Sequence, residues 1–154
     1  GGSVKLESKY GAGTKISLKL PLTVAIINSQ MVRVGKNVYA IPIANVVRDI
    51  AINKDQIKTI QSEEVVMVRG EVLPLIRLQN LFGGSCNGSK EMVVVVVERM
   101  GSNVGLVVDQ LIGQQEVIIK NIDNRFLKGL KGFAGATILG DGNVALIIDV
   151  GTLL

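Results

Sequence analysis

Few residues in this chain could carry out catalytic chemistry. The sequence has no histidine and a single cysteine, Cys86. A reactive thiol needs a neighbouring base, and serine and cysteine nucleophiles are usually activated by histidine. The lack of histidine also removes zinc sites of the usual His type and any histidine that could accept a phosphoryl group. We therefore predict no catalytic residue, no metal site and no cofactor.

The acidic residues show no pair arranged for acid–base catalysis. Glu63 and Glu64 are neighbours before an expected strand, so their side chains should diverge. The others fall singly on expected turns, namely Asp49, Asp109, Asp123, Asp141 and Asp149. An enzyme that uses two carboxylates meeting only in the folded chain stays an alternative, and raised pKa values in a shared pocket would support it.

Length and composition predict a β-rich chain that forms one domain or two very small ones. The 154 residues are 47% hydrophobic and 19% charged, which is enough apolar material for a sizeable core. Aromatic residues make up only 3%, so Val, Ile and Leu must build that core, and β-branched residues favour strands. The net charge of +4 is modest and the basic residues are scattered, so we predict no nucleic-acid binding.

The chain also lacks the marks of a membrane or secreted protein. Its longest apolar stretch, residues 92–97, is far too short to cross a bilayer and is typical of a buried strand. No secretory signal opens the sequence. We expect a cytoplasmic location without membrane insertion.

An internal repeat is the most informative feature. Residues 34–43 and 100–109 each read as an apolar run, a turn with Gly and Asn, and a second apolar run, and their glycines lie 66 residues apart. Residues 70–78 match residues 142–150 in the same way at an offset of 72. Two matches in the same order favour a duplication, although short hairpin matches also arise by chance in β proteins.

Each copy is expected to hold two hairpins around an irregular stretch. The expected pairs are 31–34 with 38–43, 65–68 with 72–75, 93–99 with 104–108, and 136–139 with 144–148. Residues 49–60 and 117–130 lie between them, and each begins with an extended apolar run. A short helical turn is expected after Asn53, and residues 121–130 are expected to form either a short helix or an ordered loop. Strands 72–76 and 93–97 are apolar on both faces, which predicts burial between the copies. We predict an all-β fold of two tandem five-stranded barrels packed together, at about 23–86 and 90–154, and leave open whether they exchange a strand.

The first 22 residues belong to neither copy. Apolar and polar residues alternate, the chain turns at residues 11–14, and Pro21 closes the segment. The pattern predicts a lone hairpin.

Three segments resemble the C-terminal part of the chemotaxis histidine kinase CheA. The motif Gly11-x-Gly13-Thr14, followed by Leu20-Pro21-Leu22-Thr23, is similar to the last hairpin of the CheA ATPase domain. Residues 38–44 followed by 69–75 resemble the first half of the CheW-like regulatory domain, and residues 132–150 resemble the ending that CheA and CheW share. CheW has no such hairpin, so the resemblance favours CheA, and a stand-alone CheW-type adaptor is the alternative.

The resemblance implies that residues 1–22 are the terminal hairpin of the ATPase domain and a linker. Residues 23–154 would be the CheW-like regulatory domain, built of SH3-like barrels. Such a module is not catalytic. It would bind the adaptor CheW and the cytoplasmic tip of chemoreceptors, and so couple receptor state to kinase activity in membrane-associated arrays. The parent kinase would dimerise through a domain outside this chain, and a fragment without the nucleotide-binding boxes should not bind ATP.

Docking residues are expected where a strand edge meets a partner. For CheW we expect two segments of the first copy, with the residues Val38, Tyr39, Ala40, Ile41, Pro42, Val66, Val68 and Arg69. Pro42 lacks a ladder donor, so it marks either a sheet edge or a strand end. Met67 is expected in the core. For a receptor helix we expect the groove between the copies, with Leu111, Ile112 and Val117.

Overall fold

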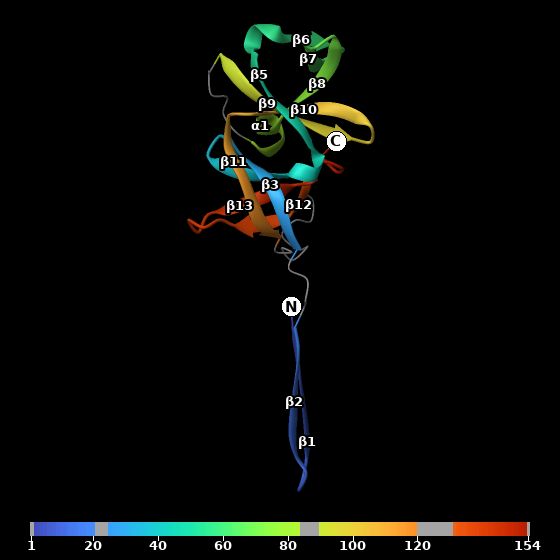
Figure 1. Ribbon diagram of the computed structural model, residues 1–154, viewed down its shortest axis with the longest axis vertical. Helices are drawn as coiled ribbons and strands as arrows, with labels where there is room; N and C mark the ends of the chain where they lie inside the picture. Colours follow the sequence, from blue (N-terminus) through green and yellow to red (C-terminus); the bar gives the residue numbers. More distant parts are fainter. Residues whose placement is uncertain (1, 21–24, 84–89, 120–130, 154) are drawn as a thin grey trace.

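The chain folds into two packed sheets preceded by a hairpin. The computed structural model describes residues 2–20, 25–83, 90–119 and 131–153. In Figure 1 the hairpin projects from one end of the molecule, and the two sheets lie one above the other. The hairpin is formed by β1 (Ser3–Lys9) and β2 (Gly13–Lys19), and every residue of both strands is exposed.

The first large sheet has six strands. In spatial order they are β5 (Val46–Asn53), β9 (Glu91–Arg99), β10 (Ser102–Val108), β8 (Glu71–Arg77), β7 (Glu63–Val68) and β6 (Ile57–Ile60). All neighbours are antiparallel except β8 and β10, which run parallel and pair over only three residues, Leu75 to Arg77. Beyond this short ladder the first halves of β8 and β10 are not paired with each other.

The second large sheet has five strands. In spatial order they are β11 (Gln110–Ile119), β3 (Ala25–Val34), β4 (Asn37–Pro42), β13 (Val144–Ile148) and β12 (Phe133–Ile138). Strands β11 and β12 are the two ends of this order and lie in contact, so the sheet curls into a barrel.

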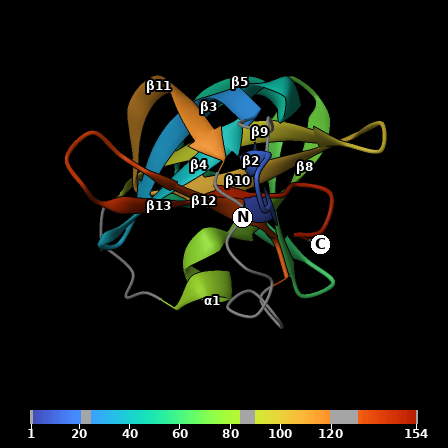
Figure 2. The same ribbon diagram turned by 90° about the horizontal axis from the view of Figure 1, so that it is seen from below.

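Helical structure is limited to three short elements in the described residues. These are the 3-10 turns η1 (Ile43–Asn45) and η2 (Lys54–Gln56) and the one-turn helix α1 (Leu78–Phe82). Within this described part, no helix is long and apolar enough to cross a membrane. Figure 2 shows α1 on the side of the molecule opposite β5 and β11.

The expected hairpins are confirmed. Strands β3 and β4, β7 and β8, β9 and β10, and β12 and β13 pair as antiparallel neighbours, as do β1 and β2. The mostly β fold is therefore confirmed. The extended start of the stretch 117–130 lies in β11, whereas residues 120–130 fall outside the described residues.

Each large sheet draws strands from both sequence copies. The first hairpin of the first copy, β3–β4, lies in the sheet with β11, β12 and β13. The first hairpin of the second copy, β9–β10, lies in the sheet with β5 to β8. The chain therefore passes between the sheets twice in the described structure, at η1 and at Asp109, which is the single residue between β10 and β11.

Three apolar clusters hold this arrangement. One lies inside the six-stranded sheet around Val66, Leu73, Val94 and Val96; Figure 1 shows β5 to β8 curving round in a ring, and we call this unit the six-stranded barrel. A second fills the five-stranded barrel around Met31 and Ala145. The third, which we call the junction core, lies between the barrels and is made of Val32, Val34, Tyr39, Ile41, Leu78, Val95, Val97, Val104, Leu106, Val108, Ile148 and Val150.

Strand β9 shows how one sequence run serves two cores. Val94 and Val96 face the six-stranded barrel, while Val95 and Val97 face the junction core, and all four are buried. Successive side chains of a strand point to opposite faces, so only an uninterrupted apolar run can fill both sides. The predicted burial of both faces is confirmed here. The same prediction is wrong for strand β8 at Val72, because the Val72 side chain is 53% exposed.

Candidate docking surfaces

The segment expected to present a sheet edge lies inside a sheet. Strand β4 is flanked by β3 and β13, and its side chains Tyr39, Ala40 and Ile41 are buried. Pro42 is the last residue of the strand. The strand-end interpretation of this proline therefore holds. Strand β4 as a whole is not an edge strand, because its parallel partner β13 pairs with Tyr39 and Ala40 on the side that β3 leaves open.

Val38 and its neighbours in β4 thus build cores rather than a surface. Tyr39 and Ile41 belong to the junction core, Ala40 faces the five-stranded barrel, and Val38 packs against the same barrel from a half-buried position. A partner protein could not contact Tyr39, Ala40 or Ile41 directly, because other side chains of the fold cover them.

The β7–β8 hairpin does present an apolar surface. Val66 is buried in the six-stranded barrel and Val68 is half-buried against it. Met67 points the other way and is 52% exposed, so its expected place in the core is wrong. It pairs directly across the hairpin with Val72. The turn between them is tight, and Arg69 has a positive φ of 50°.

A groove lies beside this hairpin, where β8 and β10 are unpaired. It has a volume of about 520 Å³ and is lined by Arg48, Val68, Glu71, Val72, Leu73, Pro74, Gly101, Ser102 and Asn103. Next to it, Met100 at the tip of the β9–β10 hairpin is 92% exposed. We call Met67, Val72, Met100 and this groove the hairpin surface. Methionine side chains adapt to irregular partners and are common at binding surfaces.

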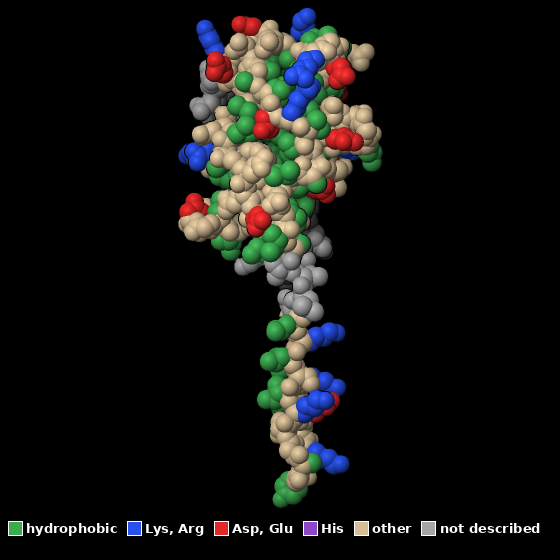
Figure 3. Space-filling model, viewed as in Figure 1, with side chains coloured by type: hydrophobic (Ala, Val, Ile, Leu, Met, Phe, Trp, Pro, Cys, Tyr) green, Lys and Arg blue, Asp and Glu red, His purple; other side chains and the backbone are tan. Residues whose placement is uncertain are grey.

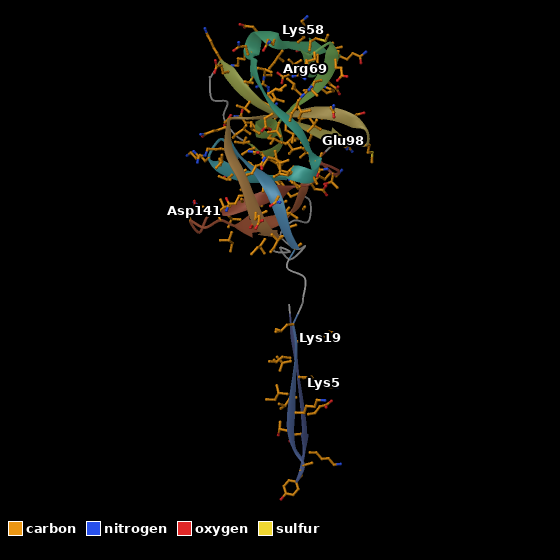
Figure 4. The ribbon with its side chains drawn as sticks, viewed as in Figure 1. Lys5, Lys19, Lys58, Arg69, Glu98 and Asp141 are labelled. Atoms are coloured by element: carbon orange, nitrogen blue, oxygen red, sulfur yellow. The ribbon has the colours of Figure 1, made fainter. Side chains whose placement is uncertain are left out.

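Charged groups frame the hairpin surface. Arg48 lines the groove, and its buried Nε has no hydrogen-bond partner in the described structure. Figure 4 shows Lys58 and Arg69 together near the end of the molecule farthest from the β1–β2 hairpin. This surface therefore joins an apolar centre to charged groups of both signs, because Glu71 lines the groove together with Arg48, and an apolar centre with a polar rim is the usual build of a protein-docking surface.

A second cleft, of about 560 Å³, lies on the α1 side of β8. Glu64 and Arg77 close part of it with a bidentate ion pair, with 2.5 Å from Nε to Oε2 and 3.0 Å from Nη2 to Oε1. Glu63 also lines the cleft, but Glu64 is already engaged by the guanidinium, so the two carboxylates do not form a free pair. Nor do three or more Cys, Asp or Glu side chains gather as a possible metal site among the described residues.

The pKa values of the carboxylates follow local causes. Partial burial raises the pKa of Asp49. Hydrogen bonds from the backbone and side chain of Asn143 lower the pKa of Asp141, which lies in the exposed β12–β13 turn. Each pKa shift has a cause in the surroundings of one carboxylate alone, and neither involves a second carboxylate as acid–base catalysis would require.

Strand β11 carries the residues expected to meet a receptor helix. It is an end strand of the five-stranded order. A bulge between Leu111 and Gly113 turns Ile112 outward, and its side chain is 48% exposed. Leu111 is half-buried and Val117 is buried in the five-stranded barrel. Of the three residues, Ile112 alone is exposed.

The junction between the barrels also contains polar and aromatic contacts that sequence reasoning missed. The Asp109 carboxylate accepts hydrogen bonds from the Gly35 N–H at 2.6 Å and from Gln79 Nε2 at 2.7 Å. Nearby, Tyr39, Phe82 and Phe133 stack with ring centroids 4.5 to 6.2 Å apart. The sequence marked Asp109 as a turn charge, because neither of its partners is near it in the chain.

Comparison with known proteins decides the family. A model of the CheW-like domain family matches residues 29–154. The chain belongs to the CheW-like domain family. The resemblance seen in the sequence is confirmed.

Relatives of this CheW-like domain include several CheA kinases. The chain is 47% identical over 156 aligned residues to the chemotaxis protein CheA of Treponema pallidum, which covers 99% of this chain and 19% of that protein. Its identity to CheA of Salmonella typhimurium is 40%, covering 99% and 23%, and to the sensor histidine kinase CheAY of Helicobacter pylori 39%, covering 99% and 19%. The chain thus spans about a fifth to a quarter of the length of these relatives.

A solved structure shows the same fold. The scaffolding protein CheW from Thermoanaerobacter tengcongensis superposes with a TM-score of 0.67 and 21% identity, covering 82% of this chain and 91% of that protein. The SH3-like fold expected for the CheW-like domain is confirmed. The alignments to CheA relatives extend over nearly the whole chain, whereas the family match begins at residue 29.

Proposed function

We propose that this chain is the non-catalytic docking module of a CheA-type kinase. It binds the adaptor CheW and the cytoplasmic tip of a chemoreceptor in the cytoplasm, and it couples receptor state to kinase activity in receptor arrays. The relatives support this proposal, because CheA proteins match the chain from end to end at 33–47% identity. We also propose the domain division at residue 22 and the two repeat copies given above.

The observation that carries the docking proposal is the hairpin surface. An apolar cross-strand pair, Met67 and Val72, stands outward from a sheet whose other face is already filled. Apolar side chains that are left half exposed gain free energy when a partner covers them. We place CheW here, with Val68 and Arg69 at its margin, and treat the buried Tyr39, Ala40, Ile41 and Val66 as the support beneath it.

Titration calorimetry with purified CheW tests this assignment. We expect Val72→Glu to weaken binding at least about tenfold, because the new carboxylate would be desolvated in an apolar contact. Val4→Glu is the matched control, since Val4 is an exposed valine in the separate β1–β2 hairpin and should leave the affinity unchanged. Wild-type protein that gives neither heat nor a complex would contradict the proposal.

The receptor contact is proposed at Ile112, with Leu111 and Val117 below it in β11. A helix lays an apolar stripe against such a surface. We expect Ile112→Glu to reduce binding of a purified chemoreceptor cytoplasmic fragment and to leave CheW binding intact. Equal loss of both partners would argue against separate surfaces.

The β1–β2 hairpin favours a CheA fragment over a stand-alone CheW adaptor. Val4 pairs with Leu18 and Leu6 with Ile16, so one face of the hairpin is apolar, and all four side chains are exposed. Figure 3 shows hydrophobic side chains along one edge of the hairpin and lysines along the other. We propose that an upstream ATPase domain covers the apolar face. Sequencing the gene upstream of Gly1 decides between the two, because a CheW adaptor would have no ATPase domain there.

A further inference from the structure

The two barrels are joined by a carboxylate at the point where the chain passes between them. Asp109 is the single residue between β10 of the six-stranded sheet and β11 of the five-stranded sheet. Its oxygens are held by both sides. Oδ2 accepts from the Gly35 N–H in the β3–β4 turn, and Oδ1 accepts from Gln79 in α1.

The hydrogen bonds of Asp109 are directional, whereas the aliphatic contacts of the junction core are not. The junction core consists of aliphatic side chains and Tyr39, which resist separation of the barrels but permit small rotations. Hydrogen bonds to a carboxylate are short and depend on angle. The backbone N–H of Asp109 also donates to the Arg33 carbonyl at 3.0 Å, so side chain and main chain fix the same point.

We propose that Asp109 is a positioning residue that sets the angle between the barrels, and thereby the place of the receptor-docking strand relative to the six-stranded barrel. The bulge that exposes Ile112 begins two residues after Asp109. Any rotation at Asp109 would therefore move Ile112 relative to the six-stranded sheet, whose strand β9 contacts β11. This inference rests on the proposed function only for its consequence in receptor binding.

The angle itself can be measured without any partner. Nitroxide labels at Lys58→Cys in β6 and Glu116→Cys in β11, in a Cys86→Ser background, place one probe on each barrel. Both positions are exposed. Double electron–electron resonance should give a narrow distance distribution in the parent protein and a broadened or displaced one in Asp109→Asn. The asparagine keeps the shape but offers one acceptor oxygen in place of two.

Two further variants separate positioning from general damage. Gln79→Met keeps the side-chain volume and removes only the α1 bond, so it should broaden the distribution less than Asp109→Asn, and the two changes should not add. Asp141→Asn is the control, because the Asp141 carboxylate accepts hydrogen bonds from Asn143 within its own exposed turn and lies away from the junction core. It should leave the distribution unchanged.

Binding then completes the test on unlabelled proteins. Asp109→Asn should weaken binding of the chemoreceptor fragment about fivefold or more while CheW binding is retained. An unchanged distance distribution, or a changed one with unaltered receptor binding, would overturn the inference. If the parent protein binds no receptor fragment, the proposed function fails, yet the distance measurement still decides whether Asp109 sets the angle.

Discussion

Gly105 lies where β10 comes closest to its neighbours. A Cβ atom at this position would lie 2.6 Å from Val94 Cγ1 and 2.7 Å from Leu75 Cδ2. Both are core side chains of the six-stranded barrel, and such cores are packed too densely to admit another carbon. The glycine is needed here for space, since its backbone conformation is ordinary for a strand.

We predict that Gly105→Ala lowers the free energy of unfolding by about 1–3 kcal/mol. Gly140→Ala is the control, because a Cβ there meets nothing within 4 Å and its φ is not positive. Urea denaturation measures both. Equal stability of the two variants would show that the barrel relaxes around the added methyl group.

Tyr39 makes the free energy of unfolding depend on pH in the alkaline range. Burial raises the pKa of its phenol above the ordinary value of 10.0, although a hydrogen bond with Asn37 opposes this in part. Above pH 10 the unfolded chain loses the Tyr39 proton while the folded chain keeps it, so the free energy of unfolding falls as pH rises toward the folded pKa. Below pH 10 this contribution is constant.

We predict that Tyr39→Phe makes the stability less sensitive to pH above about 10. Denaturant unfolding of both proteins from neutral to alkaline pH gives the comparison. Parallel curves for the two proteins would mean that the phenol titrates equally in the folded and unfolded states.

The β1–β2 hairpin is an element that the barrels do not need. All of its residues are exposed, and a single two-stranded hairpin is marginally stable in water. We predict that deleting residues 2–20 changes the free energy of unfolding of the barrels by no more than about 0.5 kcal/mol. Calorimetric or urea unfolding of the shortened chain checks this, and a clear loss of stability would reveal a contact between hairpin and barrels.

The elements were predictable from sequence where the contacts are local. All five hairpins follow from strand-like runs around Gly-containing turns, and the unbroken apolar run of β9 predicts burial on both faces. Strand β4 was misplaced at an edge because its second partner, β13, pairs at residues 146 and 147, more than a hundred residues away. Such a parallel contact leaves no local pattern.

Met67 shows a second limit. The run from Val65 to Val68 has no polar residue to mark the outward face, so the alternation that normally assigns sides of a strand is missing. The hydrogen bonds of Asp109 were likewise invisible, since Gly35 is 74 residues away in the chain. The candidate docking surfaces could therefore be located only in the folded structure, whereas the sequence motifs were enough to predict the family.

At the scale of the whole molecule, strand exchange makes the two copies depend on each other. The six-stranded barrel takes Val94 and Val96 from β9, and the five-stranded barrel takes Met31 and Ala40 from β3 and β4. Neither sequence copy contains a complete core. We predict that fragments 25–83 and 90–154 are each unfolded alone and fold when mixed.

Circular dichroism and proton–nitrogen correlation spectra of the separate and mixed fragments provide the test. Mixing should restore the dispersed spectrum of the intact chain. A fragment that folds alone would show that one copy can close its own barrel, against the exchange seen in the sheet order.

The central claim is that this module docks CheW through the surface around the β7–β8 hairpin. Mapping chemical-shift changes in the labelled module as unlabelled CheW is added tests it residue by residue. We predict changes concentrated at Met67, Arg69 and Val72 and at the neighbouring tip of β9–β10, with the β1–β2 hairpin unaffected. Changes confined to other surfaces, or none at saturating CheW, would contradict the account.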